Sequence, residues 1–309
     1  MEKTTSGWFN GFIGVAIFAG SLPATRAAVA DFDPIFLTCA RASIAALLGL
    51  VLLLVLRQPR PGLVHLIPLG LTASGVVVGF PLLTALALRH VTSAHSVVFV
   101  GLLPLCTAIF GVLRGGERPR PVFWAFSICG AVLIAGYAAM SSAGGSVKGD
   151  LLMLAAIVVC GMGYAEGARL SRMLGGWQVI SWALVLSLPV MLPTALFTMP
   201  PSFEHVGKSA WLGLAYVSVF SMLIGFVFWY RGLAQGGIAA VGQLQLVQPF
   251  MGLALAALLL HETVNWTMLL VTLAAVVCVA GSKKYASAKS VDPSLVNSRT
   301  VATGNSPAS

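Results

Sequence analysis

Long apolar stretches alternate with short polar or turn-forming joints along almost the whole chain. A helix needs about 20 mostly apolar residues to cross a bilayer. Ten segments meet this condition, and pairs such as Asp33-Pro34 and Gly115-Gly116 mark turns between them. The pattern therefore predicts an all-α integral membrane protein. Its ten predicted transmembrane helices cover residues 8–30, 35–56, 66–88, 93–113, 122–140, 151–170, 177–199, 210–230, 238–260 and 264–280.

Composition excludes a soluble protein and changes the meaning of the charge. Hydrophobic residues make up 58% of the chain and charged residues 9%, with a mean hydropathy of +0.94. A soluble domain carries about 25% charged residues to cover its wet surface, and a disordered chain needs low hydrophobicity and high charge. The lipid bilayer is therefore the expected environment, and only the polar tail 286–309 is expected to be disordered.

Lysine and arginine are distributed unevenly between the joints. If the N-terminus lies inside, 13 of the 18 basic side chains fall on the inner side, three on the outer side and two within helices. Cytoplasmic loops are enriched in these residues, so both termini are expected in the cytoplasm. Ala28-Val29-Ala30 resembles a signal-peptidase site. The segment before it is long, however, and the repeat described next requires this helix, so we expect it to be retained.

The two halves of the chain share a spacing. Pro104 precedes Glu117 by 13 residues, and Pro249 precedes Glu262 by the same number. A Gly-Phe pair lies 25 residues before the first proline and 24 before the second. Because each half contains an odd number of helices, the second must enter the membrane from the opposite side. The sequence therefore predicts two inverted five-helix repeats, residues 1–145 and 146–285, around a central cavity, as in alternating-access transporters.

This arrangement resembles the drug/metabolite transporter superfamily and, within it, the EamA-type exporters. The resemblance covers roughly residues 8–283. Besides the helices and the Pro-to-Glu spacing, it rests on Phe18-Ala19-Gly20-Ser21, where the family has Trp-Gly-Ser or Trp-Gly-Thr, and on Arg41, where it has an arginine on helix two. It implies a cavity lined by helices one, three, four, six, eight and nine. The chain is similar to bacterial inner-membrane amino-acid exporters of the YddG kind, which implies export of aromatic amino acids and methionine.

Aromatic and thioether side chains lie on the helices that this resemblance assigns to the cavity. Met222, Phe226 and Trp229 follow the i, i+4, i+7 spacing of one helix face, and a mostly apolar pocket suits a bulky substrate side chain. Gln245 can both donate and accept hydrogen bonds. Packing or hydrogen bonding between helices is the alternative role for each residue. The predicted substrate-binding residues are Pro23, Phe80, His95, Phe99, Tyr164, Met222, Phe226, Trp229 and Gln245.

Ionisable residues within the predicted helices are few, and each has two interpretations. Glu166 is a candidate proton carrier, or it forms a local ion pair with Arg169 at i+3. Arg41 is a candidate partner for a substrate carboxylate, or it pairs with Asp33 or binds a helix C-terminus. His95 is a candidate group for binding an amino acid or for titrating near neutral pH, or it is a satisfied interior residue. The pattern leaves these alternatives open.

The sequence contains no Walker lysine motif, no HExxH and no Cys/His metal spacing. We therefore expect no cofactor, no metal, no ATP and no enzymatic activity. The excess of basic residues reports topology, so no nucleic-acid partner is expected either. The expected partner is a small amino-acid substrate of a monomeric protein. Two other functions stay open: export of drugs or other metabolites with the same fold, and a non-transporting membrane receptor or scaffold. Coupling to protons also stays open.

Overall fold

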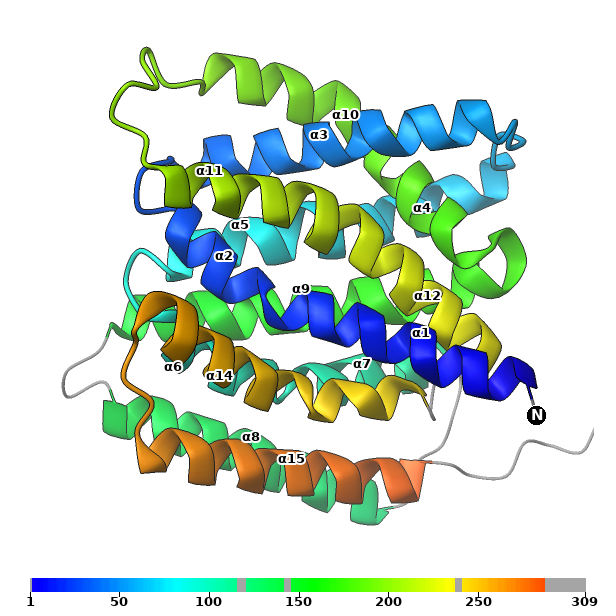
Figure 1. Ribbon diagram of the computed structural model, residues 1–309. Helices are drawn as coiled ribbons and strands as arrows, with labels where there is room; N and C mark the ends of the chain where they lie inside the picture. The colour runs from blue at the N-terminus through cyan, green and yellow to red at the C-terminus, as the bar shows by residue number, and fades with distance from the viewer. Residues whose placement is uncertain (1, 116–120, 142–145, 237–240, 287–309) are drawn as a thin grey trace, which may run out of the picture.

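A computed structural model describes residues 2–115, 121–141, 146–236 and 241–286, which form helices and their connections without any strand in these ranges (Figure 1). Glu117 and almost all of the tail 286–309 lie outside the described residues. The first half contains α1 (Glu2–Ala19), α2 (Ser21–Ala28), α3 (Pro34–Val55), η1 (Leu63–His65), α4 (Leu66–Thr72), η2 (Ala73–Gly79), α5 (Phe80–Ala87), α6 (Ser93–Val100), α7 (Leu103–Gly115) and α8 (Pro121–Ser141). The second half contains α9 (Val147–Leu174), α10 (Gly176–Phe197), α11 (Lys208–Ala215), η3 (Tyr216–Ile224), α12 (Gly225–Gly236), η4 (Gly242–Leu246), α14 (Gln248–Leu260) and α15 (Trp266–Ala286).

Helices overlap every predicted hydrophobic segment, and several segments are built from consecutive helical pieces. Within the described residues, six helical runs are long and apolar enough to cross a membrane: 6–28, 34–55, 63–87, 147–174, 176–197 and 208–233. Three shorter apolar helices cover Ser93–Thr107, Leu244–Leu260 and Trp266–Cys278. The all-helical, multi-pass architecture is therefore confirmed. The count of ten crossings and the inversion of the second half stay predictions.

The turn predicted at Asp33-Pro34 is a helix cap. The Asp33 carboxylate accepts hydrogen bonds from the backbone N–H groups of Ile35 at 2.8 Å and Phe36 at 3.4 Å. Pro34 occupies the first helical position, where its missing N–H is not needed. Capping of this kind fixes where a helix begins. It therefore sets the register of α3, which carries Arg41 two turns further on.

Two helices contain a π-helical stretch at matching places in the two halves. The first, η2, ends at Gly79 and is followed by Phe80, while the second, η3, ends just before Gly225 and Phe226. These are the Gly-Phe pairs of the repeat. A π-helical turn is uncommon and is frequent at functional sites. The two halves therefore share a local irregularity as well as a spacing.

The helices pack as a bundle with its central members around α9 (Figure 1). At one edge α3 packs against α10, and at the opposite edge α8 packs against α15. Between them α1 packs against α12, and α5 and η2 pack against α9. The last contact is close: a Cβ on Gly75 would lie 2.6 Å from the carbonyl oxygen of Val159 and 2.8 Å from the Cα of Gly163. Two facing glycines thus let η2 approach α9 beside Tyr164.

Candidate functional site

A small cavity of about 30 Å³ lies at the centre of the bundle. Small-molecule sites are typically about 300–1,000 Å³ and mostly apolar, so this cavity must widen to hold a substrate. The lining agrees with the helices that the resemblance implies, and the second predicted helix adds Arg41. Its residues are Phe18, Ser21, Leu22, Arg41, Val76, Phe80, Pro81, Val100, Leu103, Cys160, Tyr164, Ser221, Met222, Phe226 and Gln248.

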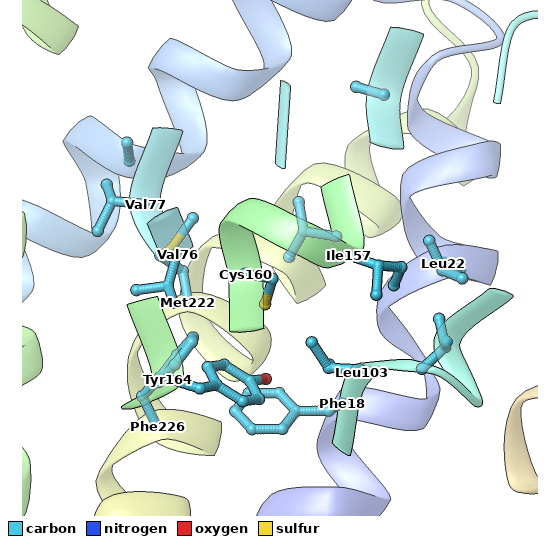
Figure 2. Close-up of a cluster of buried hydrophobic side chains, with 14 of the residues drawn as sticks. Phe18, Leu22, Val76, Val77, Leu103, Ile157, Cys160, Tyr164, Met222 and Phe226 are labelled. Carbon is cyan, nitrogen blue, oxygen red and sulfur yellow. The ribbon is translucent and has the colours of Figure 1, made fainter. Parts of the chain in front are cut away.

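Aromatic rings form one side of this cavity, as Figure 2 shows. The ring of Phe18 lies edge-on to Phe226 with centroids 4.9 Å apart, and Tyr164 lies 5.9 Å from Phe226 and 6.4 Å from Phe18. Met222 and Phe80 also line the cavity. Edge-to-face rings and a thioether form a polarizable apolar surface. Such a surface can receive a bulky apolar group once the side chains move apart.

The polar side chains of the cavity come from α2, α3, η3 and α14. Arg41 from α3 is 5% exposed, and its Nη2 lies 3.4 Å from the Ser221 hydroxyl, whereas its Nε has no hydrogen-bond partner. The hydroxyls of Ser221 and Ser21 lie 2.7 Å apart. Gln248, at the start of α14, is 8% exposed, and its side-chain oxygen lacks a partner. The lining contains no carboxylate within the described part of the chain.

The alternative partner predicted for Arg41 is engaged elsewhere. Asp33 caps α3 and lies 4.0 Å from Arg89 Nη1, in a pair that is half exposed. No ion pair joins Arg41 to an acidic side chain among the residues described. A buried guanidinium without a counter-charge is costly. The geometry therefore leaves Arg41 available to an anionic group entering the cavity.

The structure brings some of the predicted substrate-binding residues together and separates the others. Phe80, Tyr164, Met222 and Phe226 line the cavity. Trp229 packs behind the rings, 6.4 Å from Phe18 and 6.2 Å from Tyr164. The remaining four are buried outside the lining, namely Pro23, His95, Phe99 and Gln245.

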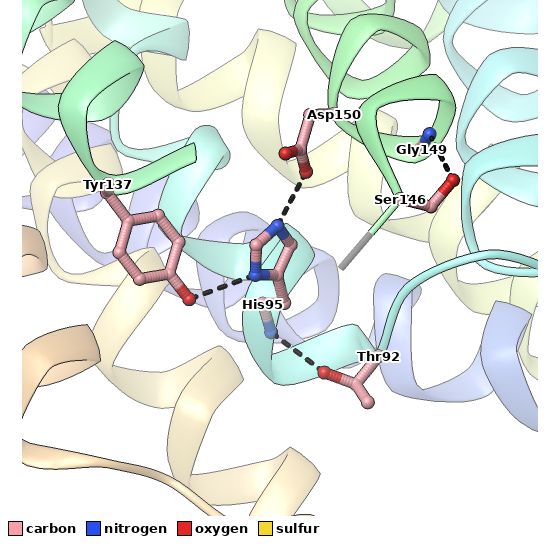
Figure 3. A network of polar contacts seen from close by, with 6 residues as sticks. All are labelled: Thr92, His95, Tyr137, Ser146, Gly149 and Asp150. Atoms are coloured by element: carbon pink, nitrogen blue, oxygen red, sulfur yellow. Dashed lines mark hydrogen bonds and ion pairs between the residues drawn. The ribbon is translucent and has the colours of Figure 1, made fainter. Parts of the chain in front are cut away.

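His95 instead belongs to a buried polar cluster at the start of α6 (Figure 3). Its Nε2 lies 2.6 Å from Asp150 Oδ1 on α9, and its Nδ1 lies 3.0 Å from the hydroxyl of Tyr137 on α8. Phe99 packs beside the imidazole, with ring centroids 5.5 Å apart. Both ring nitrogens of His95 therefore have a hydrogen-bond partner inside the protein.

Glu166 is paired as its structural interpretation requires. Arg169 Nη2 donates to Glu166 Oε1 at 2.7 Å, and Glu166 is 2% exposed while the Arg169 side chain is half exposed. Arg169 also borders a second, more open hollow at this end of α9. That hollow is lined by Val64, His65, Pro68, Arg169, Arg172 and Met173.

Three functional candidates escaped the sequence analysis. Asp150 lies one residue before the predicted start of its helix, so it was not counted among the embedded charges. Ser21 and Ser221 are common residue types, and only their contact across 200 positions reveals them. The available signal for Asp150 was its position directly before the predicted helix 151–170.

Comparisons with known proteins agree on the class of protein. The model of the EamA-like transporter family matches residues 5–140 and again residues 147–282. The "Uncharacterized transporter YdeK" of Bacillus subtilis (strain 168) is 66% identical over 286 residues, which cover 93% of this chain and 100% of that protein. The "Uncharacterized transporter YyaM" of the same organism is 23% identical and covers 73% of this chain and 77% of its own length. A solved crystal structure superimposes with a TM-score of 0.62 at 20% identity, covering 91% of this chain and 98% of the other.

Proposed function

The chain belongs to the EamA-like transporter family, and from this premise we propose that it is a secondary transporter that exports amino acids with bulky apolar side chains, such as aromatic amino acids and methionine, across the bacterial inner (cytoplasmic) membrane. The observation that supports this most is the make-up of the central cavity: a cluster of rings with Met222 beside the buried Arg41, without a carboxylate in the described lining. An apolar surface suits the side chain of such a substrate, and a free cation suits its carboxylate.

The packing of the helices supports the proposed inverted repeats. If residues 1–145 correspond to residues 146–285, the contact of α1 with α12 corresponds to the contacts of α9 with α4, η2 and α5. The pairs α3 with α10 and α8 with α15 correspond to themselves. A two-fold relation between five-helix halves predicts this exchange. We therefore propose ten crossings, with both termini in the cytoplasm and a monomer as the working unit.

Polar links between the proposed halves lie at both ends of the cavity. At the proposed outer end, the Asp31 carboxylate accepts from the Gly207 N–H at 2.8 Å. At the proposed inner end, Asn10 Nδ2 donates to Gln235 Oε1 at 3.2 Å. Further links near the ends are Gln58 with Gln178, His95 with Asp150, and Ser93 with Glu262. Breaking the links at one end while keeping those at the other is what alternating access requires, so this pattern supports transport by rocking of the two halves.

The alternative functions are less well supported. A cationic drug would have to enter beside Arg41 in a cavity whose described lining offers no acidic side chain. Like charges in a desolvated site repel strongly. A receptor or scaffold has no need for a central cavity between two related halves.

Counterflow in proteoliposomes tests the proposal. Vesicles loaded with unlabelled phenylalanine, tryptophan or methionine should accumulate the labelled amino acid faster than empty-lipid controls. Phe226→Ala should lower this rate because it removes a ring from the cavity, whereas Phe220→Ala, at a 47% exposed position on the same helical run, should leave it unchanged. If no amino acid in a full panel exchanges above the empty vesicles, the proposed substrate class is wrong.

A further inference from the structure

We infer that Arg41 and Gln248 form a recognition site for a zwitterion, in which the Arg41 guanidinium binds the substrate carboxylate and the Gln248 side-chain oxygen accepts from its ammonium group. The inference rests on the proposed function, because it takes the same central cavity as the substrate site. It adds which polar side chains bind the substrate and which of them contributes more to the affinity.

One edge of the Arg41 guanidinium, formed by Nε and Nη2, carries donors that are free or weakly used. Nε has no partner, and Nη2 has only the 3.4 Å contact with Ser221. The N–H bonds of Nε and Nη2 point in the same direction, so this edge can hold both oxygens of a carboxylate at once. Ser221 is itself bonded to Ser21, which keeps its hydroxyl oriented within the cavity.

The missing partner of Arg41 is informative because the side chain is buried. The side chain is more than nine-tenths buried, in a part of the protein proposed to lie within the membrane. In such a place a charge normally has a partner that compensates its lost hydration. No described acidic residue lies in the cavity lining. The substrate is therefore the natural source of the negative charge.

Gln248 supplies a hydrogen-bond acceptor in the same lining. Its side-chain oxygen is buried and unpartnered, and a carbonyl oxygen can only accept. An ammonium group can only donate. The ammonium would meet a neutral dipole at Gln248, whereas the carboxylate would meet a full charge at Arg41. The contact at Gln248 should therefore contribute less to the binding free energy. The site should consequently require the carboxylate and only prefer the ammonium.

Three phenyl compounds separate these contributions. L-phenylalanine carries both charged groups, 3-phenylpropionate carries only the carboxylate, and phenethylamine carries only the ammonium. We expect phenylalanine to bind best, 3-phenylpropionate next and phenethylamine least. Binding is read as the ligand-dependent rise in the apparent melting temperature of the purified full chain in detergent, and as competition against labelled phenylalanine in counterflow.

Variants test whether Arg41 binds the carboxylate of the ligand and Gln248 its ammonium group. Arg41→Gln should weaken binding of both carboxylates by about ten- to a hundredfold, the range for a hydrogen bond to a charged group. Arg231→Gln is the matched control, since Arg231 is exposed on α12 and outside the cavity lining. Gln248→Leu should bring the affinity for phenylalanine down towards that for 3-phenylpropionate and leave the latter unchanged.

Several outcomes would overturn the inference. Phenethylamine binding as well as 3-phenylpropionate to the wild-type chain would do so, as would Arg41→Gln with an unchanged order of ligands, or a wild-type chain that neither carboxylate protects. If Arg41→Gln does not fold, the order measured on the wild-type chain decides. Carboxylate binding through Arg41 without any amino-acid flux would defeat the proposed transport and leave the recognition site standing.

Discussion

Glu262 and Ser93 are joined by two hydrogen bonds although 169 positions separate them in the sequence. The Ser93 backbone N–H donates to Oε1 at 3.1 Å, and its hydroxyl donates to Oε2 at 2.8 Å. The N–H of Ala94 adds a third bond at 2.7 Å. The carboxylate therefore caps α6 from the connection between α14 and α15. This gives the glutamate of the Pro-to-Glu repeat a physical role: it fixes the start of the helix that carries His95.

Glu262→Gln should destabilise the protein modestly. The amide keeps an oxygen acceptor but loses the negative charge, which favours the N-terminus of a helix. A cap of this kind is worth about 1 kcal/mol. The apparent melting temperature in detergent should fall, while Glu204→Gln, at an exposed position in the connection before α11, should leave it unchanged. Equal melting temperatures for both variants would argue against the cap.

Asp150→Ala should cost considerably more. The aspartate is 5% exposed and pairs with His95 at 2.6 Å, so its removal leaves a buried imidazole without that partner. Breaking a buried pair by deleting one member typically costs about 3–5 kcal/mol. Lys148→Ala, two residues earlier on the exposed side of the same helix, is the control. Thermal unfolding of the two variants side by side measures the difference, and a loss no larger than that of the control would show that the pair contributes little.

Gly75→Ala should disturb the contact between η2 and α9. The added Cβ would lie 2.6 Å from a backbone oxygen, and backbone cannot yield as a flexible side chain does. Overpacking in a dense interior costs about 1–3 kcal/mol. Gly70→Ala lies one and a half turns earlier, where a Cβ would meet nothing within 4 Å. Only the first variant should lose thermal stability, and a Gly75→Ala protein as stable as Gly70→Ala would contradict the close packing.

The proposed inversion makes a topological prediction. Single cysteines introduced at positions 117 and 262 of a chain whose five native cysteines are replaced should react with a membrane-impermeant maleimide from opposite sides of the membrane. Odd-numbered five-helix halves place these two glutamates on opposite faces. Labelling of both positions from the same side of intact cells would refute the inverted arrangement.

The hydrophobic pattern was sufficient to predict the helices, because a spanning helix shows its length and composition directly in the sequence. The pattern was less successful in predicting which side chains of a single helix face the cavity. Met222, Phe226 and Trp229 share a face by regular spacing, yet Met222 and Phe226 reach the cavity and Trp229 packs behind it. The π-helical stretch ends at Ile224, before both Phe226 and Trp229, so it does not separate these two side chains. Three positions of a regular helix place two side chains about 60° apart around its axis, and periodicity alone does not show which of them reaches a cavity.

The hydrophobic pattern also could not predict contacts between residues far apart in the sequence. His95 was expected in the substrate site, but its contacts are with Asp150, 55 positions away, and Tyr137, 42 positions away, on two other helices. Gln245 was predicted to bind substrate, but the structure places Gln248, three residues later, in the lining instead. Which of two neighbouring polar residues faces a cavity depends on how the helix is rotated in the bundle. That rotation is set by tertiary packing.

The link between His95 and Asp150 has a kinetic consequence if the halves rock as proposed. It joins the two halves near the end of the cavity that faces outwards, so it must separate and re-form once in every turnover, whichever cargo is carried. The free-energy cost of separating His95 from Asp150 is the same for a good substrate and a poor one. If this separation limits turnover, maximal velocities should vary little across the accepted substrates, and discrimination among them should appear mainly in their half-saturating concentrations.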